Sequence, residues 1–137
     1  MKLNQTDPDY IKAMQLYMAS DFARAREAFR ALKDKYEPSP VIQLHLGDVE
    51  YSMGNLDRAA EIYQEAITLQ PDFGLALYKA GVCLHRAGKL EQALKCFERV
   101  VELKNQSHAM AAYFVGLINL FLGRDEAAIE GFSLLRR

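Results

Sequence analysis

The chain has 137 residues, a formal net charge of −1 at pH 7 and an isoelectric point near 6.3. This length fits one small domain, and the balanced charge gives no long-range attraction to nucleic acid or to anionic membranes. No apolar run reaches the roughly 18 residues that a membrane span needs, and the N-terminal residues lack the apolar core of a signal peptide. We therefore expect a cytoplasmic protein that binds neither nucleic acid nor membrane.

The first expected helix covers residues 8–19, with Asp7 as its N-cap and proline at its first helical position. A turn at Ser20-Asp21 leads to a second helix over 22–35. Prolines within residues 37–40 then end this pair, because each proline biases its predecessor away from the helical region. The N-terminal third thus reads as a helical hairpin.

Three further helical pairs follow the first. They are expected over 41–53 and 56–69, over 73–87 and 90–103, and over 108–122 and 125–135, with turns at Gly54, Gly88 and Gly123. Glycine at these turns supplies left-handed backbone geometry at little steric cost. Asp72 is expected to cap the third pair and Ser107 the fourth. Strand-like alternation is absent from the sequence, so the fold class is all-α.

The same residue types return with a period of 34 residues (81 minus 47). Gly47, Gly54, Ala59, Tyr63, Ala66 and Pro71 recur as Gly81, Gly88, Ala93, Phe97, Val100 and Asn105. Counted from Pro40, these are positions 8, 15, 20, 24, 27 and 32 of a repeat. Small residues at positions 8 and 20 let two helices approach closely, while the aromatic at 24 is expected to fill the space towards the neighbouring repeat.

This pattern resembles the tetratricopeptide repeat, a 34-residue helix-turn-helix unit. The resemblance covers essentially the whole chain, with repeats at approximately 6–39, 40–73, 74–108 and 109–137. It implies a right-handed superhelical solenoid of four hairpins in a single domain over 1–137. Asp9 and Lys12 stand at positions where the third repeat has Leu77 and Ala80, which predicts a polar N-terminal cap.

In such a solenoid the first helix of each repeat lines a concave surface, and positions 2, 5, 9 and 12 of that helix form one stripe. The expected peptide-binding groove consists of Tyr10, Met14, Tyr17, Leu44, Asp48, Tyr51, Tyr78, Val82, His85, Tyr113 and Leu117. Tyrosine at positions 5 and 12 is typical of the family, but the aliphatic members and Met14 are not explained in this way. A first helix that is apolar on both faces indicates a binding surface.

The resemblance therefore implies a protein-protein interaction module, a scaffold or chaperone-like adaptor. Its ligand would be an apolar helical or extended segment of a partner. The family's lysine and asparagine clamp for acidic C-termini is not expected, because Tyr10 and Met14 occupy the positions concerned. The apolar groove instead resembles that of the repeat chaperones of secretion systems.

An alternative function is that of a self-associating assembly subunit. The final helix carries Ile129, Phe132, Leu134 and Leu135, and part of this apolar face has no following helix to cover it. A homo-oligomer would use Phe132 and Leu135.

Catalysis, metals and cofactors have no support in the sequence. The three histidines fall in different repeats and no catalytic motif is present. Cys83 and Cys96 lack zinc-ligand spacing and indicate buried thiols in a reducing compartment. Glu50 and Asn119, both polar where the repeat favours apolar residues, are expected to form polar networks between repeats. We expect a protein without enzymatic activity, metal or cofactor.

Overall fold

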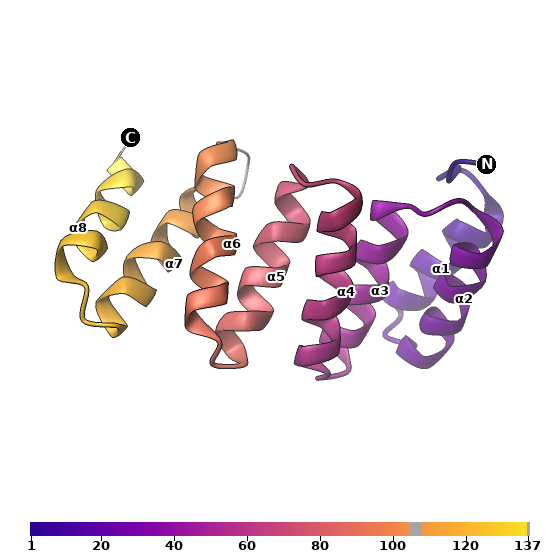
Figure 1. Ribbon diagram of the computed structural model, residues 1–137. Helices are drawn as coiled ribbons and strands as arrows, with labels where there is room; N and C mark the ends of the chain where they lie inside the picture. Colours follow the sequence, from indigo (N-terminus) through magenta and orange to yellow (C-terminus); the bar gives the residue numbers. More distant parts are fainter. Residues whose placement is uncertain (105–107, 137) are drawn as a thin grey trace. The chain divides into compact units, whose positions relative to one another are not determined.

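The computed structural model describes residues 1–104 and 108–136, which are helical throughout apart from turns and connections (Figure 1). The elements are α1 (Pro8–Met18), α2 (Phe22–Lys35), α3 (Pro40–Ser52), α4 (Leu56–Leu69), α5 (Gly74–Arg86), α6 (Leu90–Leu103), α7 (His108–Phe121), α8 (Asp125–Ser133) and the 3-10 helix η1 (Leu134–Arg136). No strand occurs in the described residues. The all-α prediction is confirmed, and the expected helices differ from the observed ones only at their ends.

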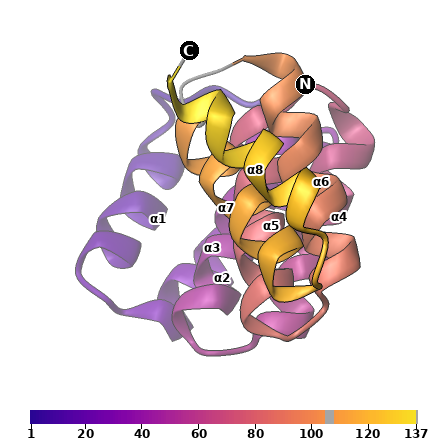
Figure 2. The same ribbon diagram turned by 90° about the vertical axis from the view of Figure 1, so that its left-hand side faces the viewer.

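The chain divides into two compact units, residues 1–71 and residues 72–137. The first unit contains the hairpins α1/α2 and α3/α4, and α2 also packs on α3. The second unit contains α5/α6 and α7/α8, and α6 packs on α7. In Figure 2, α8 lies nearest the viewer with α7 behind it. The assignment of residues 1–137 to a single domain stays a prediction.

Left-handed residues form the turns within all four hairpins. Gly54, Gly88 and Gly123 have φ values of 84°, 81° and 77°, which glycine adopts without the steric penalty of a Cβ atom. Ser20 adopts a φ of 61° in the first hairpin. The turn positions predicted from the sequence are therefore confirmed, including the one that lacks glycine.

The helix caps match the sequence only in part. Asp7 caps α1 through a hydrogen bond that its Oδ1 accepts from the backbone N–H of Asp9, at 2.9 Å. The expectation for Asp72 is wrong, since the N-cap residue of α5 is Phe73 and no side chain caps this helix. Helix α5 starts one residue too late for Asp72 to occupy the N-cap position. Ser107 lies outside the described residues.

A close contact between an aromatic ring and a glycine holds three hairpins together. A Cβ atom added to Gly47, Gly81 or Gly116 would lie within 2.5–2.8 Å of a ring atom on the second helix of the same hairpin. These rings belong to Tyr63, Phe97 and Phe132. The repeat pattern predicts that the aromatic residue at position 24 fills the space towards the neighbouring repeat. The structure shows that it first packs within its own repeat.

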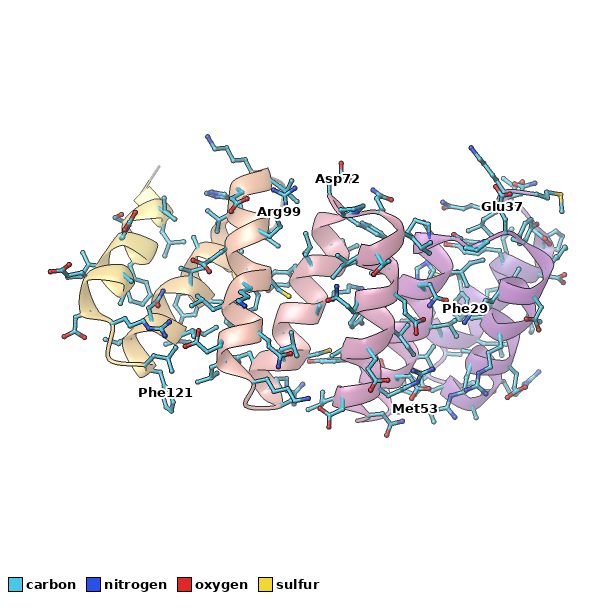
Figure 3. The ribbon with its side chains drawn as sticks, viewed as in Figure 1. Phe29, Glu37, Met53, Asp72, Arg99 and Phe121 are labelled. Carbon is cyan, nitrogen blue, oxygen red and sulfur yellow. The ribbon has the colours of Figure 1, made fainter. Side chains whose placement is uncertain are left out.

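Phe97 packs both within its own repeat and against the next repeat. Its ring lies against Gly81 of its own hairpin, and it also stacks on Phe114 of the next hairpin, with ring centroids 4.6 Å apart and planes 5° apart. In the first unit, Phe29 of α2, labelled in Figure 3, is fully buried, and its ring centroid lies 6.5 Å from that of Tyr10 on α1 and 5.2 Å from that of His45 on α3. The aromatic position therefore forms the core of each repeat.

The N-terminal hairpin is tied together by Asp7. Its Oδ2 accepts hydrogen bonds from Lys35 Nζ, at 2.6 Å, and from the Tyr36 hydroxyl. The hydrogen bonds from Lys35 and Tyr36 lower the pKa of Asp7 from 3.8 to about 2. Asp9 and Lys12 are exposed, as expected for a polar cap, and Asp9 lies 3.3 Å from Lys35 Nζ.

Gly81→Ala should destabilise the protein, because the added methyl group would overlap the Phe97 ring. Overpacking of this kind costs about 1–3 kcal/mol, which exceeds the gain of about 1 kcal/mol that alanine brings to a helix. Urea unfolding followed by circular dichroism measures the difference. The double variant Gly81→Ala/Phe97→Leu should lose less unfolding free energy than the sum of the losses in the two single variants. A Gly81→Ala protein as stable as wild type would contradict the contact.

Asp7→Asn should lower the unfolding free energy at pH 7 but have little effect near pH 2. Because the folded pKa of Asp7 lies below its usual value, its contribution is present above pH 3.8 and is lost as the pH falls towards 2. Unfolding curves of both proteins at several pH values test this. Asp34→Asn, an exposed position on α2, is the control. If Asp7→Asn lost as much unfolding free energy at pH 2 as at pH 7, the lowered pKa of Asp7 would be contradicted.

Candidate functional site

The first unit contains six of the predicted groove residues, and the structure buries half of them. Tyr10, Leu44 and Asp48 are 5–8% exposed, so they belong to the core of the first unit. The partly exposed members are Met14, Tyr17 and Tyr51. The predicted stripe is therefore only partly available to a ligand in this unit.

A chain of polar contacts explains the burial of Tyr10 and Asp48. The Tyr10 hydroxyl lies 2.9 Å from His45 Nε2, and His45 Nδ1 lies 3.6 Å from Asp48 Oδ2. Asp48 Oδ1 accepts a hydrogen bond of 2.5 Å from the Tyr63 hydroxyl. Burial raises the pKa of Tyr10. His45, which the groove prediction left out, thus links the first hairpin to the second.

The network predicted at Glu50 is present. Arg26 Nε of α2 lies 2.8 Å from Glu50 Oε1 of α3, and Asn55 Nδ2 donates to Glu50 Oε2 at 2.7 Å. Burial raises the pKa of Glu50, but the hydrogen bonds from Asn55 and Arg26 outweigh it and hold that pKa below its usual value. Asn119 instead donates to the Val115 carbonyl of its own helix, at 2.9 Å.

The second unit contains the other five predicted groove residues, and all of them reach the surface. Tyr113 is exposed, whereas Tyr78, Val82, His85 and Leu117 are partly buried. Phe114 brings three of these side chains together. Its ring centroid lies 6.3 Å from that of Tyr78, 5.3 Å from that of His85 and 6.0 Å from that of Tyr113. Phe114 is not among the predicted groove residues, because it lies one residue beyond Tyr113 of the stripe.

His85 and Leu117 also share a cavity of about 480 Å³. Its lining residues are His85, Gly88, Leu90, Leu117, Ile118 and Phe121. This volume lies in the range of about 300–1,000 Å³ that ligand pockets occupy. Phe121 is 78% exposed and projects from the lower end of α7 (Figure 3). The cavity joins the end of α5 to the end of α7 and is almost wholly apolar.

The two residues predicted to support self-association differ in their surroundings. Phe132 is partly buried and packs on Gly116, so its ring is part of the last hairpin. Leu135 is exposed, and Ile129 beside it on α8 is 69% exposed. Leu94, which holds the position of Ile129 in the preceding hairpin, is only 5% exposed. Ile129 on α8 and Leu135 on η1 are therefore exposed apolar side chains of the last hairpin.

Other kinds of site are not found in the described residues. Within 1–104 and 108–136, no three His, Cys, Asp or Glu side chains are grouped as a metal site would require. None of the helices described has the length and apolar character needed to cross a membrane. Cys83 is buried and Cys96 is partly buried, and burial raises the pKa of the Cys96 thiol.

Four curated proteins are similar in sequence, and two of them illustrate the likeness. Human tetratricopeptide repeat protein 7A is 33% identical over 79 residues, covering 58% of this chain and 9% of that protein. The peroxisomal targeting signal receptor of Candida glabrata is 29% identical over 91 residues, covering 66% of this chain and 15% of the receptor. The matched segment is thus a small part of either relative.

Three solved structures share the fold. MamA superimposes with a TM-score of 0.83 at 19% identity, over 96% of this chain and 79% of MamA. YrrB, described as a tetratricopeptide repeat protein with an unusual peptide-binding site, gives 0.79 at 23% identity, over 93% of this chain and 65% of YrrB. SycD, a type III secretion translocator chaperone of Yersinia enterocolitica, gives 0.75 at 19% identity, over 91% of this chain and 90% of SycD.

The tetratricopeptide repeat family model matches residues 12–72, 44–107 and 86–136. These segments together extend over nearly the whole chain and agree with the 34-residue period and the helical hairpins. The chain belongs to the tetratricopeptide repeat family.

Proposed function

We propose that this chain is a protein-interaction module that binds an apolar segment of a partner polypeptide against the first helices of its hairpins. The cavity of about 480 Å³ beside His85 and Leu117 is the observation that carries this proposal. A peroxisomal targeting signal receptor among the sequence relatives and a peptide-binding site named for YrrB support a role in peptide recognition.

The chemistry of the cavity favours a bulky apolar side chain. Leu90, Leu117 and Ile118 provide aliphatic walls, and Phe121 adds an exposed ring at the rim. Burying one leucine-sized or phenylalanine-sized side chain contributes about 1.5–3 kcal/mol. His85 and the exposed Tyr113 can hydrogen-bond to the peptide backbone, as polar groups do in mainly apolar sites.

The first unit contributes differently to the proposal. Met14, Tyr17 and Tyr51 remain partly exposed. Met14 supplies a flexible apolar contact, and Tyr17 and Tyr51 supply rigid ones. Met14 and Tyr17 pack against the buried core of the first unit, which includes Tyr10. The proposal includes no catalytic step, cofactor, nucleic acid or membrane, and it places the protein in the cytoplasm as a scaffold or chaperone-like adaptor.

Self-association is the second candidate function. It is favoured by two exposed apolar side chains, Ile129 on α8 and Leu135 on η1, which no other described helix covers. Apolar surface of this kind commonly marks an interaction site. Two copies that meet through these side chains would form a dimer, so the chain would act as an assembly subunit. The cavity beside Leu117 would stay open in this dimer.

Leu117→Glu should weaken peptide binding at least tenfold, since it places a charge in the apolar cavity. The probe is the tightest 16-residue peptide selected from a random phage-displayed library, titrated by calorimetry. Ile129→Glu is the matched control, because it places the same charge on an exposed apolar position of α8. Circular dichroism confirms folding. Equal affinity of wild type and Leu117→Glu would refute the proposal.

If α8 mediates self-association, wild type should form dimers or larger species in light scattering over a concentration series. Ile129→Glu should then convert them to monomers, while Asp34→Asn should not. A wild-type chain that stays monomeric at every concentration would exclude this second function.

A further inference from the structure

The first unit has a second cavity that shares no residue with the predicted groove. It has a volume of about 370 Å³ and lies where the end of α2, the connection 37–39, the start of α3 and the end of α4 meet. Its lining residues are Lys33, Glu37, Pro38, Ser39, Ile42, Gln43, Glu65, Thr68 and Leu69. Figure 3 labels Glu37 at this connection.

Gln43 is the unusual member of this cavity. It occupies repeat position 4, where the third repeat has Leu77 and the fourth has Ala112. It is only 5% exposed, and its Nε2 donates to Glu65 Oε2. This contact fixes the orientation of the amide, because a carboxylate can only accept. The carbonyl oxygen Oε1 is then buried, and no described group donates to it.

None of the other polar groups that line the cavity donates a hydrogen bond to Gln43 Oε1. Ser39 Oγ accepts from the backbone N–H of Ile42, and Thr68 Oγ1 donates to the carbonyl of Gln64. Glu65 and Glu37 present carboxylates, of which Glu37 also lies 3.6 Å from the N-terminal amino group. Lys33 is the one cation among the described lining residues. Acceptors therefore outnumber donors around an apolar interior.

We propose that this cavity receives an arginine side chain carried by a partner protein. The guanidinium group offers five donors and no acceptor, which matches a buried carbonyl beside a carboxylate. Its aliphatic stem would lie against Pro38, Ile42 and Leu69. This site goes beyond the apolar groove, because it recognises a cation and is built from α2, α3, α4 and the connection 37–39, all within the first unit.

N-acetyl-arginine methylamide is the probe for this site, titrated into the labelled protein by two-dimensional NMR. Saturable shifts are expected at the backbone amides of residues 37, 39, 41–43 and 65–69, with a millimolar Kd. The citrulline analogue has donors without charge and should bind at least tenfold more weakly. The norleucine analogue, which is apolar only, should not saturate. The absence of saturable shifts with the arginine probe would overturn the proposal, and so would equal binding of the norleucine analogue.

Two variants locate the site. Gln43→Leu introduces the residue that the third repeat carries at this position, and Glu65→Gln removes the carboxylate. Each should weaken the arginine probe at least tenfold. Glu61→Gln, an exposed position on the same helix, should not. If Gln43→Leu does not fold, Glu65→Gln decides alone, and unchanged affinity in a folded variant refutes the site. Leu117→Glu should bind the arginine probe normally, so this test is independent of the groove.

Discussion

The contact between an aromatic ring and a glycine determines how closely the two helices of a repeat approach. Tyr63, Phe97 and Phe132 each lie against the glycine at position 8 of their hairpin. The second helix therefore buries the inner side of the first helix, and the residues of the predicted stripe that reach the surface lie on the remaining side. Tyr63 contributes to both the helix packing and the predicted groove, since its ring packs on Gly47 and its hydroxyl donates to Asp48.

The same scaffold carries two different surfaces in its two units. In the first, the contacts of His45 with Tyr10 and Asp48 draw polar groove residues into the interior. In the second, Phe114 gathers aromatic rings, and an apolar cavity remains beside Leu117. A repeat sequence thus sets the backbone, while residues that vary between repeats set the ligand chemistry. Gln43, which replaces an apolar repeat residue, is a further example of such variation.

Local features could be predicted well because they depend on a few neighbouring residues. The period of 34 residues located the helices, and the glycine turns required only backbone geometry. Burial within the stripe could not be predicted, because it depends on side chains that reach across from other helices. Leu44 and Tyr113 belong to the same stripe but are 5% and 43% exposed. Phe121 lies one residue beyond the stripe, so a prediction from repeat position alone leaves it out of the groove, although it lines the cavity.

Methyl NMR with a library-selected apolar peptide tests the central claim most directly, because it reports which side chains the peptide touches. Val82 and Leu117 lie on the first helices α5 and α7, whereas Val101 and Ile129 lie on the second helices α6 and α8. Binding against the first helices predicts that the methyl signals of Val82 and Leu117 shift on titration while those of Val101 and Ile129 stay in place. Shifts confined to Val101 and Ile129 would contradict the proposed mode of recognition.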